Sequence, residues 1–285
     1  MAEKILFGTA GVPHSSKGPD SVSGIERVRE LGLDAMELEF VRGVHMGEET
    51  ARLTGEAAQK QGVMLRVHAP YFINLNSSDK KKLGASKKRI LDSARIGSIA
   101  GAKIVTFHPA FFQGEDKKQV LEKVISEIGG IIDEIKNQKL DIALAPETTG
   151  KPTQLGSLQE TIAMCSSLKE LQPMIDFSHL HARENGRFKN KKDFENALNE
   201  IPVKFLKFLH MHASGINFSE KGERNHMNME ETGNSFNYKW LIEALKEKKV
   251  SGCIICESPN LEDDALLMQG YYSGLQKNLM KEQDF

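Results

Sequence analysis

Short apolar runs alternate with stretches of helical periodicity along almost the whole chain. In the longer stretches apolar residues recur three or four positions apart, as on one face of a helix. Ile25, Val28 and Leu31 form one such stripe. The short runs between them read as buried strands of a parallel sheet. This strand–loop–helix rhythm fits the chain eight times and predicts an α/β fold.

The pattern places each element within a few residues. Strands are expected at 5–8, 35–40, 63–67, 102–107, 142–146, 173–175, 205–213 and 253–256. Helices are expected at 24–33, 48–61, 79–100, 117–136, 156–168, 192–199, 237–248 and 261–281. The longest irregular stretch, 214–237, is long enough to suggest a functional loop. Eight βα units in about 250 residues are typical of a TIM (β/α)8 barrel. No linker or break in composition divides the chain, so we expect a single domain over residues 1–285.

Several apolar runs end in a residue that can bind a divalent cation. These residues are His68, His108, Glu147, Asp176, His210 and Glu257. The carboxyl ends of barrel strands meet at one face, so the six side chains are expected to gather there. Any one of them could instead be a polar residue at the exit of a buried strand. Six in register favour a metal site at the C-terminal face of the barrel.

Further histidines enlarge this candidate site. His179 follows Asp176 by three residues, and His226 lies in the long loop after the seventh strand. His210 and His212 share one face of a strand, so either or both could bind metal, or one could pack against a carboxylate beside it. Imidazoles with carboxylates suit zinc, manganese or iron. So many ligands exceed the needs of one tetrahedral zinc and indicate two or three metals, an arrangement suited to phosphodiester cleavage.

Composition limits the function classes only broadly. The 285 residues are 39% hydrophobic and 27% charged, as in an ordinary soluble enzyme. No apolar run approaches the roughly 20 residues that span a bilayer, and no signal-peptide pattern opens the chain. We therefore expect a cytoplasmic protein with no membrane partner. The three cysteines, Cys165, Cys253 and Cys256, are expected to be reduced packing residues, since Cys253 and Cys256 fall on opposite faces of a strand.

Charge and loop motifs remove some alternatives. The net charge of −1 is mildly awkward for a nucleic-acid partner, which favours a basic face. The basic stretch Lys80–Lys82 with Lys87–Arg89 is either a solvated helix start or a patch facing phosphate. No glycine-rich phosphate loop follows a strand, so a nucleotide cofactor is not expected. Asp176, Ser178 and His179 are too close in sequence for a Ser-His-Asp relay.

The chain resembles the endonuclease IV family of apurinic/apyrimidinic endonucleases, among the xylose-isomerase-like barrels. The similarity runs from the first strand to the eighth. It rests on the segments 68–75 (HAPYFINL), 101–109 (GAKIVTFHP), 146–150 (PETTG), 175–179 (IDFSH), the strand at His210 and 256–259 (CESP).

The resemblance implies hydrolysis of the phosphodiester 5′ to an abasic site in double-stranded DNA, for base excision repair, by a monomer with three zinc ions. It implies that His68 and His108 hold the first zinc and that Glu147, the catalytic residue orienting the nucleophile, bridges it to the second. It assigns Asp176, His210 and Glu257 to the second zinc, and His179 with His226 to the third. Tyr71 and Phe72 match positions that press into DNA at the lesion, or else pack within their loop.

Two positions depart from the family pattern. The family carries Asp-x-His in the seventh loop, whereas this chain reads Glu223-Arg224-Asn225-His226, with arginine at the aspartate position. Glu223 is a substitute ligand, and Arg224 is a candidate DNA-binding residue that neutralises phosphate charge. His212 replaces an asparagine and is a further candidate ligand. The resemblance therefore leaves two or three zinc ions per chain open, with manganese or iron as alternatives.

Two other functions fit parts of the pattern. A metal-dependent sugar isomerase or epimerase uses the same barrel with fewer metals, and the pair His179 and His226 is surplus to it. A non-catalytic DNA-lesion-binding protein would follow if the altered third site had lost turnover. Metal stoichiometry and cleavage of abasic DNA distinguish the three.

Overall fold

Eight parallel strands form one continuous sheet in the computed structural model, which describes residues 4–283. The strands are β1 (Ile5–Ala10), β2 (Ala35–Glu39), β3 (Met64–His68), β4 (Ile104–Phe107), β6 (Ala143–Pro146), β8 (Met174–Asp176), β9 (Leu209–Ala213) and β12 (Gly252–Cys256). They are ordered β6-β4-β3-β2-β1-β12-β9-β8. Single bridges, Leu144 to Leu171 and Glu147 to Met174, join the two ends of the sheet. The sheet is therefore a barrel, and the prediction of a TIM (β/α)8 fold is confirmed.

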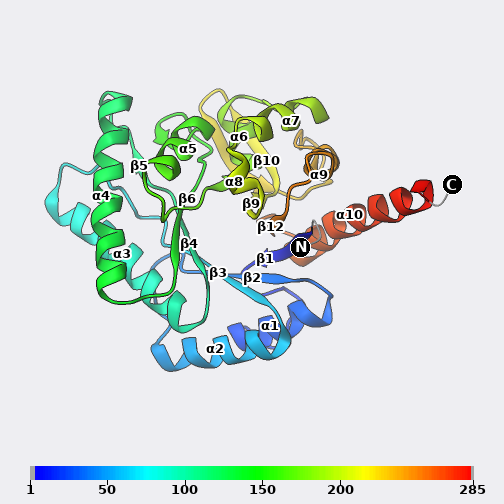
Figure 1. Ribbon diagram of the computed structural model, residues 1–285, viewed down its shortest axis with the longest axis horizontal. Helices are drawn as coiled ribbons and strands as arrows, with labels where there is room; N and C mark the ends of the chain where they lie inside the picture. Colours follow the sequence, from blue (N-terminus) through cyan, green and yellow to red (C-terminus); the bar gives the residue numbers. More distant parts are fainter. Residues whose placement is uncertain (1–3, 284–285) are drawn as a thin grey trace.

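Helices surround the strands on the outside (Figure 1). They are α1 (Ser21–Glu30), α2 (Glu48–Gln61), α3 (Lys80–Ile99), α4 (Lys117–Asn137), α5 (Leu158–Ser167), α6 (Phe177–Arg183), α7 (Lys191–Asn199), α8 (Val203–Leu206), α9 (Tyr238–Glu247) and α10 (Glu262–Gln283). Helices α1 to α5 pack in sequence order, each on the next, as successive βα units of a barrel do. The predicted helix 48–61 agrees with α2 at both ends.

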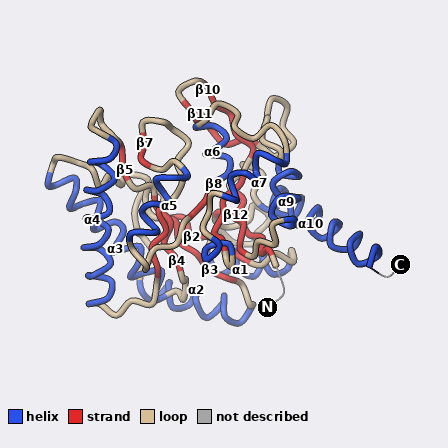
Figure 2. The backbone as a smooth tube through the Cα atoms, turned by 45° about the horizontal axis from the view of Figure 1, so that its top comes forward, coloured by secondary structure: helices blue, strands red, loops and turns tan. Residues whose placement is uncertain are grey.

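Two small antiparallel sheets stand above one end of the barrel (Figure 2). One pairs β5 (Ala110–Phe111) with β7 (Gln154–Leu155), and the other pairs β10 (Gly215–Ser219) with β11 (Gly222–Met227). Both lie in connections that leave the carboxyl ends of barrel strands. They therefore mark the face at which the candidate ligands emerge.

Strand alternation explains what fills the barrel. In β2, Met36 and Leu38 belong to the main hydrophobic core. Glu37 and Glu39 alternate with them, and Glu37 approaches His212 of β9 across the barrel interior. In β3, Arg66 is the largest fully buried side chain of the described residues. The interior of this barrel is thus charged where branched aliphatic residues are usual.

The structure differs from the predicted elements in three places. The seventh strand begins at Leu209 rather than 205, because α8 follows Pro202 and ends at Leu206. The loop 214–237, predicted to be irregular, contains the hairpin of β10 and β11. Helix α6, not predicted as a helix, starts directly after β8, where the Asp176 side chain accepts a hydrogen bond from the His179 backbone N–H.

The cysteine prediction is confirmed. Cys165, Cys253 and Cys256 are free and buried. Cys253 packs with Ala35 and Ile255 in a small cluster, and Cys256 belongs to the main core, so the two lie on opposite faces of β12. Among the described helices, none has an apolar stretch long enough to cross a membrane.

Candidate metal centre

Three overlapping groups of ligand-type side chains lie at the carboxyl ends of the strands. They are His68, His108 and Glu147; Glu147, Asp176, His212 and Glu257; and Asp176, His179, His226 and Glu257. Within each group the ligand atoms lie within 4.8 Å of one another. Glu147 is common to the first two groups, and Asp176 and Glu257 to the last two. The groups therefore form one continuous cluster, which we call the ligand cluster.

The first group is centred on one oxygen of Glu147. His68 Nε2 lies 3.1 Å and His108 Nε2 lies 3.0 Å from Glu147 Oε2. His68 Nδ1 lies 2.8 Å from the carbonyl oxygen of Ala69. A carbonyl only accepts, so Nδ1 carries the hydrogen and Nε2 is free to face the cluster.

The second group brings in the other oxygen of Glu147. His212 Nδ1 lies 2.9 Å from Glu147 Oε1 and 3.3 Å from Glu257 Oε1. Within residues 4–283, Asp176 Oδ2 and Glu257 Oε2 are buried and lack a hydrogen-bond partner. Buried carboxylate oxygens without a hydrogen bond are costly, and a divalent cation would satisfy them. This donor set fits a bound metal ion.

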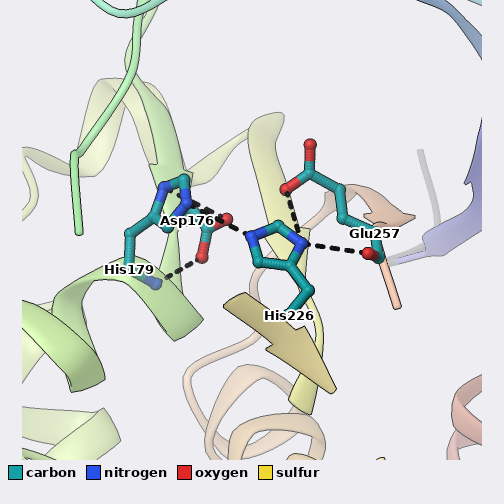
Figure 3. A group of neighbouring side chains, drawn as sticks. All are labelled: Asp176, His179, His226 and Glu257. Carbon is teal, nitrogen blue, oxygen red and sulfur yellow. Dashed lines mark hydrogen bonds and ion pairs between the residues drawn. The ribbon is translucent and has the colours of Figure 1, made fainter. Parts of the chain in front are cut away.

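The third group pairs two imidazoles from different elements (Figure 3). His179 Nδ1 lies 3.0 Å from the carbonyl oxygen of Thr148, and His226 Nδ1 lies 3.0 Å from that of Glu257. Both Nδ1 atoms therefore carry hydrogens, and the two Nε2 atoms face each other at 3.5 Å. Two neutral imidazoles would direct lone pairs at each other there, so a proton or a cation is needed between them.

Glu223 extends the third group. Its Oε2 lies 3.6 Å from His179 Nε2, and its Oε1 lies 3.9 Å from His226 Nε2. Residues three apart in a regular strand point to opposite faces. In β11, however, the register shifts so that Asn217 pairs with Asn225 and Phe218 with Glu223. Arg224 is the extra residue of this bulge and is exposed, while Glu223 and His226 reach the same side.

The carboxylates hold protons on the imidazoles when no cation is present. Burial lowers the pKa of His68, but its hydrogen bond to Glu147 outweighs this and raises the pKa to about 10. Burial likewise opposes protonation of His179 and His212, yet Asp176 acts on His179, and Glu257 on His212, to hold each pKa well above its usual value. The ligand cluster thus requires positive charge, which metal ions would supply in place of protons.

Glu147 remains ionised despite complete burial. Burial alone would raise its pKa, but His212 and His108 hold the pKa well below its ordinary value. Burial raises the pKa of Glu257. A carboxylate that stays charged in the interior is available as a bridging ligand.

His210 lies elsewhere than the sequence prediction placed it. In the register of β8 and β9, His212 pairs with Asp176 whereas His210 pairs with Met174. His210 is therefore one layer deeper in the barrel, beside Arg66, and it belongs to none of the groups found among the described residues. Burial, then Arg66, holds its pKa well below the usual value, so it is neutral. His212 occupies the position expected of His210, because the strand alternation carries both side chains inward and only the later one reaches the rim.

Two exposed aromatic residues stand beside the ligand cluster. Tyr71 and Phe72 are 52% and 66% exposed. The Tyr71 ring lies 5.7 Å from that of His68 and 6.3 Å from that of His108. Arg89 donates a hydrogen bond to the Phe72 carbonyl, so one residue of the basic stretch in α3 supports this loop. Lys87 and Lys88 instead form ion pairs with Glu127 and Asp92.

Two carboxylates of β2 were not predicted from the sequence. Glu37 is fully buried and lies 2.8 Å from His212 Nε2. Glu39 has a pKa raised to about 8 by burial and by the negative charge of Glu37. The alternation Met36-Glu37-Leu38-Glu39 was the available signal, because it places both carboxylates on the face opposite the apolar residues.

A closed parallel barrel with a cluster of imidazoles and carboxylates at the carboxyl ends of its strands defines a TIM barrel with candidate metal sites. Residues 25–272 match the family model described as xylose isomerase-like TIM barrel, and the chain belongs to this family.

Similar proteins include an uncharacterized protein, endonucleases and an epimerase-like protein. The uncharacterized protein MJ0133 of Methanocaldococcus jannaschii is 38% identical over 275 residues, 95% of this chain and 98% of that protein. The probable endonuclease 4 of Mycoplasma mobile is 28% identical over 55% of this chain and 56% of its own length. A D-tagatose 3-epimerase-like protein is similar in structure with a TM-score of 0.73 and 18% identity, covering 98% of this chain and 99% of the other. Endonuclease IV from Thermus thermophilus gives 0.70 and 16%, covering 95% and 99%. At these identities the two solved structures show the fold alone.

Proposed function

We propose that this protein is a metal-dependent endonuclease that hydrolyses the phosphodiester 5′ to abasic sites in double-stranded DNA, as part of base excision repair. The observation that carries the proposal is the third group, with His179 and His226 facing each other beside Glu223. These side chains are surplus to a site for one cation. Several curated relatives bear the name probable endonuclease 4, which supports the same activity.

The charge of the site supports more than one metal. With the imidazoles neutral, as metal ligands are, negative charge predominates: Glu37, Glu39, Glu147, Asp176, Glu223 and Glu257 bring six carboxyl groups to the cluster and the interior beneath it, beside the guanidinium of Arg66. A phosphodiester is itself an anion, and such a site would repel it. Two or three divalent cations would offset most of this negative charge. Bound there, they would stabilise the attacking and leaving oxygens of the displacement and lower the pKa of water.

The residues of the site have separate roles in this proposal. His68, His108 and Glu147 would hold one cation, and the second group would hold another. Glu147, kept ionised by its imidazole neighbours, would orient the attacking water through its carboxylate oxygens. Tyr71, exposed beside His68, and its exposed neighbour Phe72 would stack against bases next to the lesion. An abasic nucleotide is displaced from the stack at lower cost than an intact one, which gives selectivity without base readout.

A hollow beside the third group offers contacts for phosphate. Lys151, Lys221 and Arg224 line it together with Glu223, which also faces His179. The guanidinium of Arg224 suits a phosphate group of the DNA backbone. Arg224 therefore takes the role of a DNA contact rather than of a metal ligand.

The test is incubation with duplex DNA that carries one synthetic abasic analogue. Metal-depleted protein supplied with zinc or manganese should nick the strand on the 5′ side and leave a 3′-hydroxyl that a polymerase can extend. The same duplex with an intact nucleotide is the control. Intact abasic substrate at stoichiometric protein with either metal would exclude the proposal.

Sugar epimerisation is the second candidate. The group of Glu147, Asp176, His212 and Glu257 could by itself form a site for one metal. Solved structures of similar fold include proteins described as sugar epimerases. One metal per chain together with turnover of a ketose would favour this function. Tight binding of abasic DNA without cleavage under any metal would instead indicate a lesion-binding protein.

A further inference from the structure

We propose that Glu37 is a positioning residue that fixes His212 in the orientation and tautomer needed for metal binding. The proposal rests on the metal-dependent function above and adds to it a residue outside the ligand groups. Glu37 lies on β2 and His212 on β9, and the two approach each other through the barrel interior. Both side chains are fully buried.

The geometry gives the two nitrogens of His212 different partners. Nε2 lies 2.8 Å from Glu37 Oε1, which is within the distance of an ion pair. The ring N–H does not point straight at that oxygen, so the contact does not have hydrogen-bond geometry. Nδ1 lies 2.9 Å from Glu147 Oε1 on the other side of the ring. In the metal-free protein, Nδ1 is the nitrogen that hydrogen-bonds to a carboxylate, that of Glu147. A cation on that side would take the Nδ1 lone pair instead and leave the hydrogen on Nε2, beside Glu37, whose carboxylate can only accept. The lone pair of Nδ1 then faces Glu147 and Glu257.

Glu37 has the guanidinium of Arg66 on its other side. Arg66 Nε lies 3.8 Å from Glu37 Oε2, and its guanidinium also donates to the Cys253 carbonyl from within the barrel. Because Arg66 offsets the charge of Glu37, His212 can stay neutral while it binds a cation.

If Glu37, Arg66 and His212 had a purely structural role, replacing Glu37 would have a different effect on metal affinity. If Glu37 only balanced Arg66, its replacement would lower stability and leave metal affinity at the rim unchanged. If it orients His212, its loss weakens metal binding through His212 and through no other ligand. Partners of this kind typically change metal affinity by about 10- to 100-fold.

The experiment is a double-mutant cycle read by zinc affinity in chelator competition. Glu37→Leu should weaken binding about 100-fold, and Glu37→Gln, which keeps an acceptor oxygen but loses the charge, about 10-fold. In a His212→Ala background neither change should weaken binding further. Glu262→Gln is the control, since this buried carboxylate accepts from the backbone N–H groups of His14 and Ser15 and belongs to none of the ligand groups among the described residues. It should leave zinc affinity unchanged.

Nitrogen chemical shifts of histidine supply a second readout. At a zinc concentration between the two affinities, the wild-type protein should show the His212 signal of the tautomer with hydrogen on Nε2, and Glu37→Leu should show the metal-free signal. If Glu37→Leu does not fold, Glu37→Gln alone decides. Wild-type affinity in the folded variants, or losses that add to that of His212→Ala, would overturn the inference. Zinc binding without DNA cleavage would refute only the nuclease, whereas a wild-type protein that binds no divalent cation would refute both.

Discussion

The Nε2 atoms of His179 and His226 lie 3.5 Å apart, while each Nδ1 donates a hydrogen bond to a backbone carbonyl oxygen. The carbonyls come from different connections, Thr148 after β6 and Glu257 after β12. The backbone thereby fixes which face each imidazole presents. The pair is oriented before any ligand arrives, which lowers the conformational entropy lost on binding.

Replacing His226 tests whether this pair holds its own metal ion. His226→Asn should remove one metal per chain and leave the others bound, because the other two groups do not include His226. Elemental analysis of protein dialysed against zinc would measure the change. Asn225→Ala, at the exposed neighbouring position, should keep the full complement. An unchanged metal count in His226→Asn would argue against a site between the two imidazoles.

Glu147 is expected to be the most sensitive residue for catalysis. Its two oxygens contact His68, His108 and His212, so Glu147→Gln removes charge from two ligand groups at once. We expect cleavage of abasic duplex to fall by at least about 100-fold, the scale of a lost acid–base group. Single-turnover rates at saturating zinc would measure it. A variant with the wild-type rate would remove Glu147 from the mechanism.

The exposed aromatic pair should affect DNA binding without affecting metal binding. Stacking of a base on an aromatic ring contributes about 1–3 kcal/mol. Tyr71→Ala and Phe72→Ala should therefore each weaken affinity for abasic duplex by about 5- to 150-fold. Fluorescence anisotropy would report the affinity. Phe111→Ala, which removes another exposed ring, is the comparison. Equal losses in all three variants would indicate a nonspecific effect.

Stability of the metal-free protein should fall as pH rises above neutrality. His68 has a pKa of about 10 when folded and 6.5 as an ordinary imidazole, so between these values the folded protein holds a proton that the unfolded chain releases. The folded state then binds more protons, and its stability decreases with pH. Glu39, with its pKa raised to about 8, acts in the same direction.

Denaturant midpoints of metal-free protein from about pH 7 to 9 would measure this slope. Saturating zinc should flatten it, because bound cations displace the imidazole protons. If the denaturant midpoint of the metal-free protein rose with pH, the assignment of raised pKa values to His68 and Glu39 would be wrong.

His210 and His212 form a matched pair for distinguishing ligand from interior residue. His212→Ala should lose metal at the second group, since its Nδ1 faces Glu147 and Glu257. His210→Ala should retain metal and lose stability instead, by about 0.5–3 kcal/mol, as most destabilising point mutations do. Metal analysis and thermal unfolding of both variants would separate the effects. Metal loss in His210→Ala alone would restore the sequence-based assignment.

Sequence periodicity predicted the barrel because each of its signals is local. An apolar run, a following loop and an amphipathic stretch are properties of adjacent residues, and the helix 48–61 was placed at both ends on that basis. The ligands at strand ends followed from the same logic, since parallel strands share their carboxyl edge. His68, His108, Glu147, Asp176 and Glu257 do gather there.

What the sequence could not supply was register between distant strands. Choosing between His210 and His212 required knowing that His212, and not His210, is level with Asp176. The side on which Glu223 lies depended on a bulge at Arg224, which arises from pairing with Phe218 and Asn217. The partnership of Glu37 with His212 joins residues on non-neighbouring strands. Such relationships exist only once the barrel has closed.

In the part of the chain that the structure describes, two isolated bridges close the barrel between β6 and β8, and two residues of the ligand cluster flank this junction. Glu147 leaves one strand of the junction and Asp176 ends the other. A cation bound by both carboxylates would link β6 to β8, where few backbone hydrogen bonds hold the barrel closed. Stripping the metal should therefore loosen this junction first, and amide hydrogens near Leu144, Leu171 and Met174 should exchange fastest among the barrel strands.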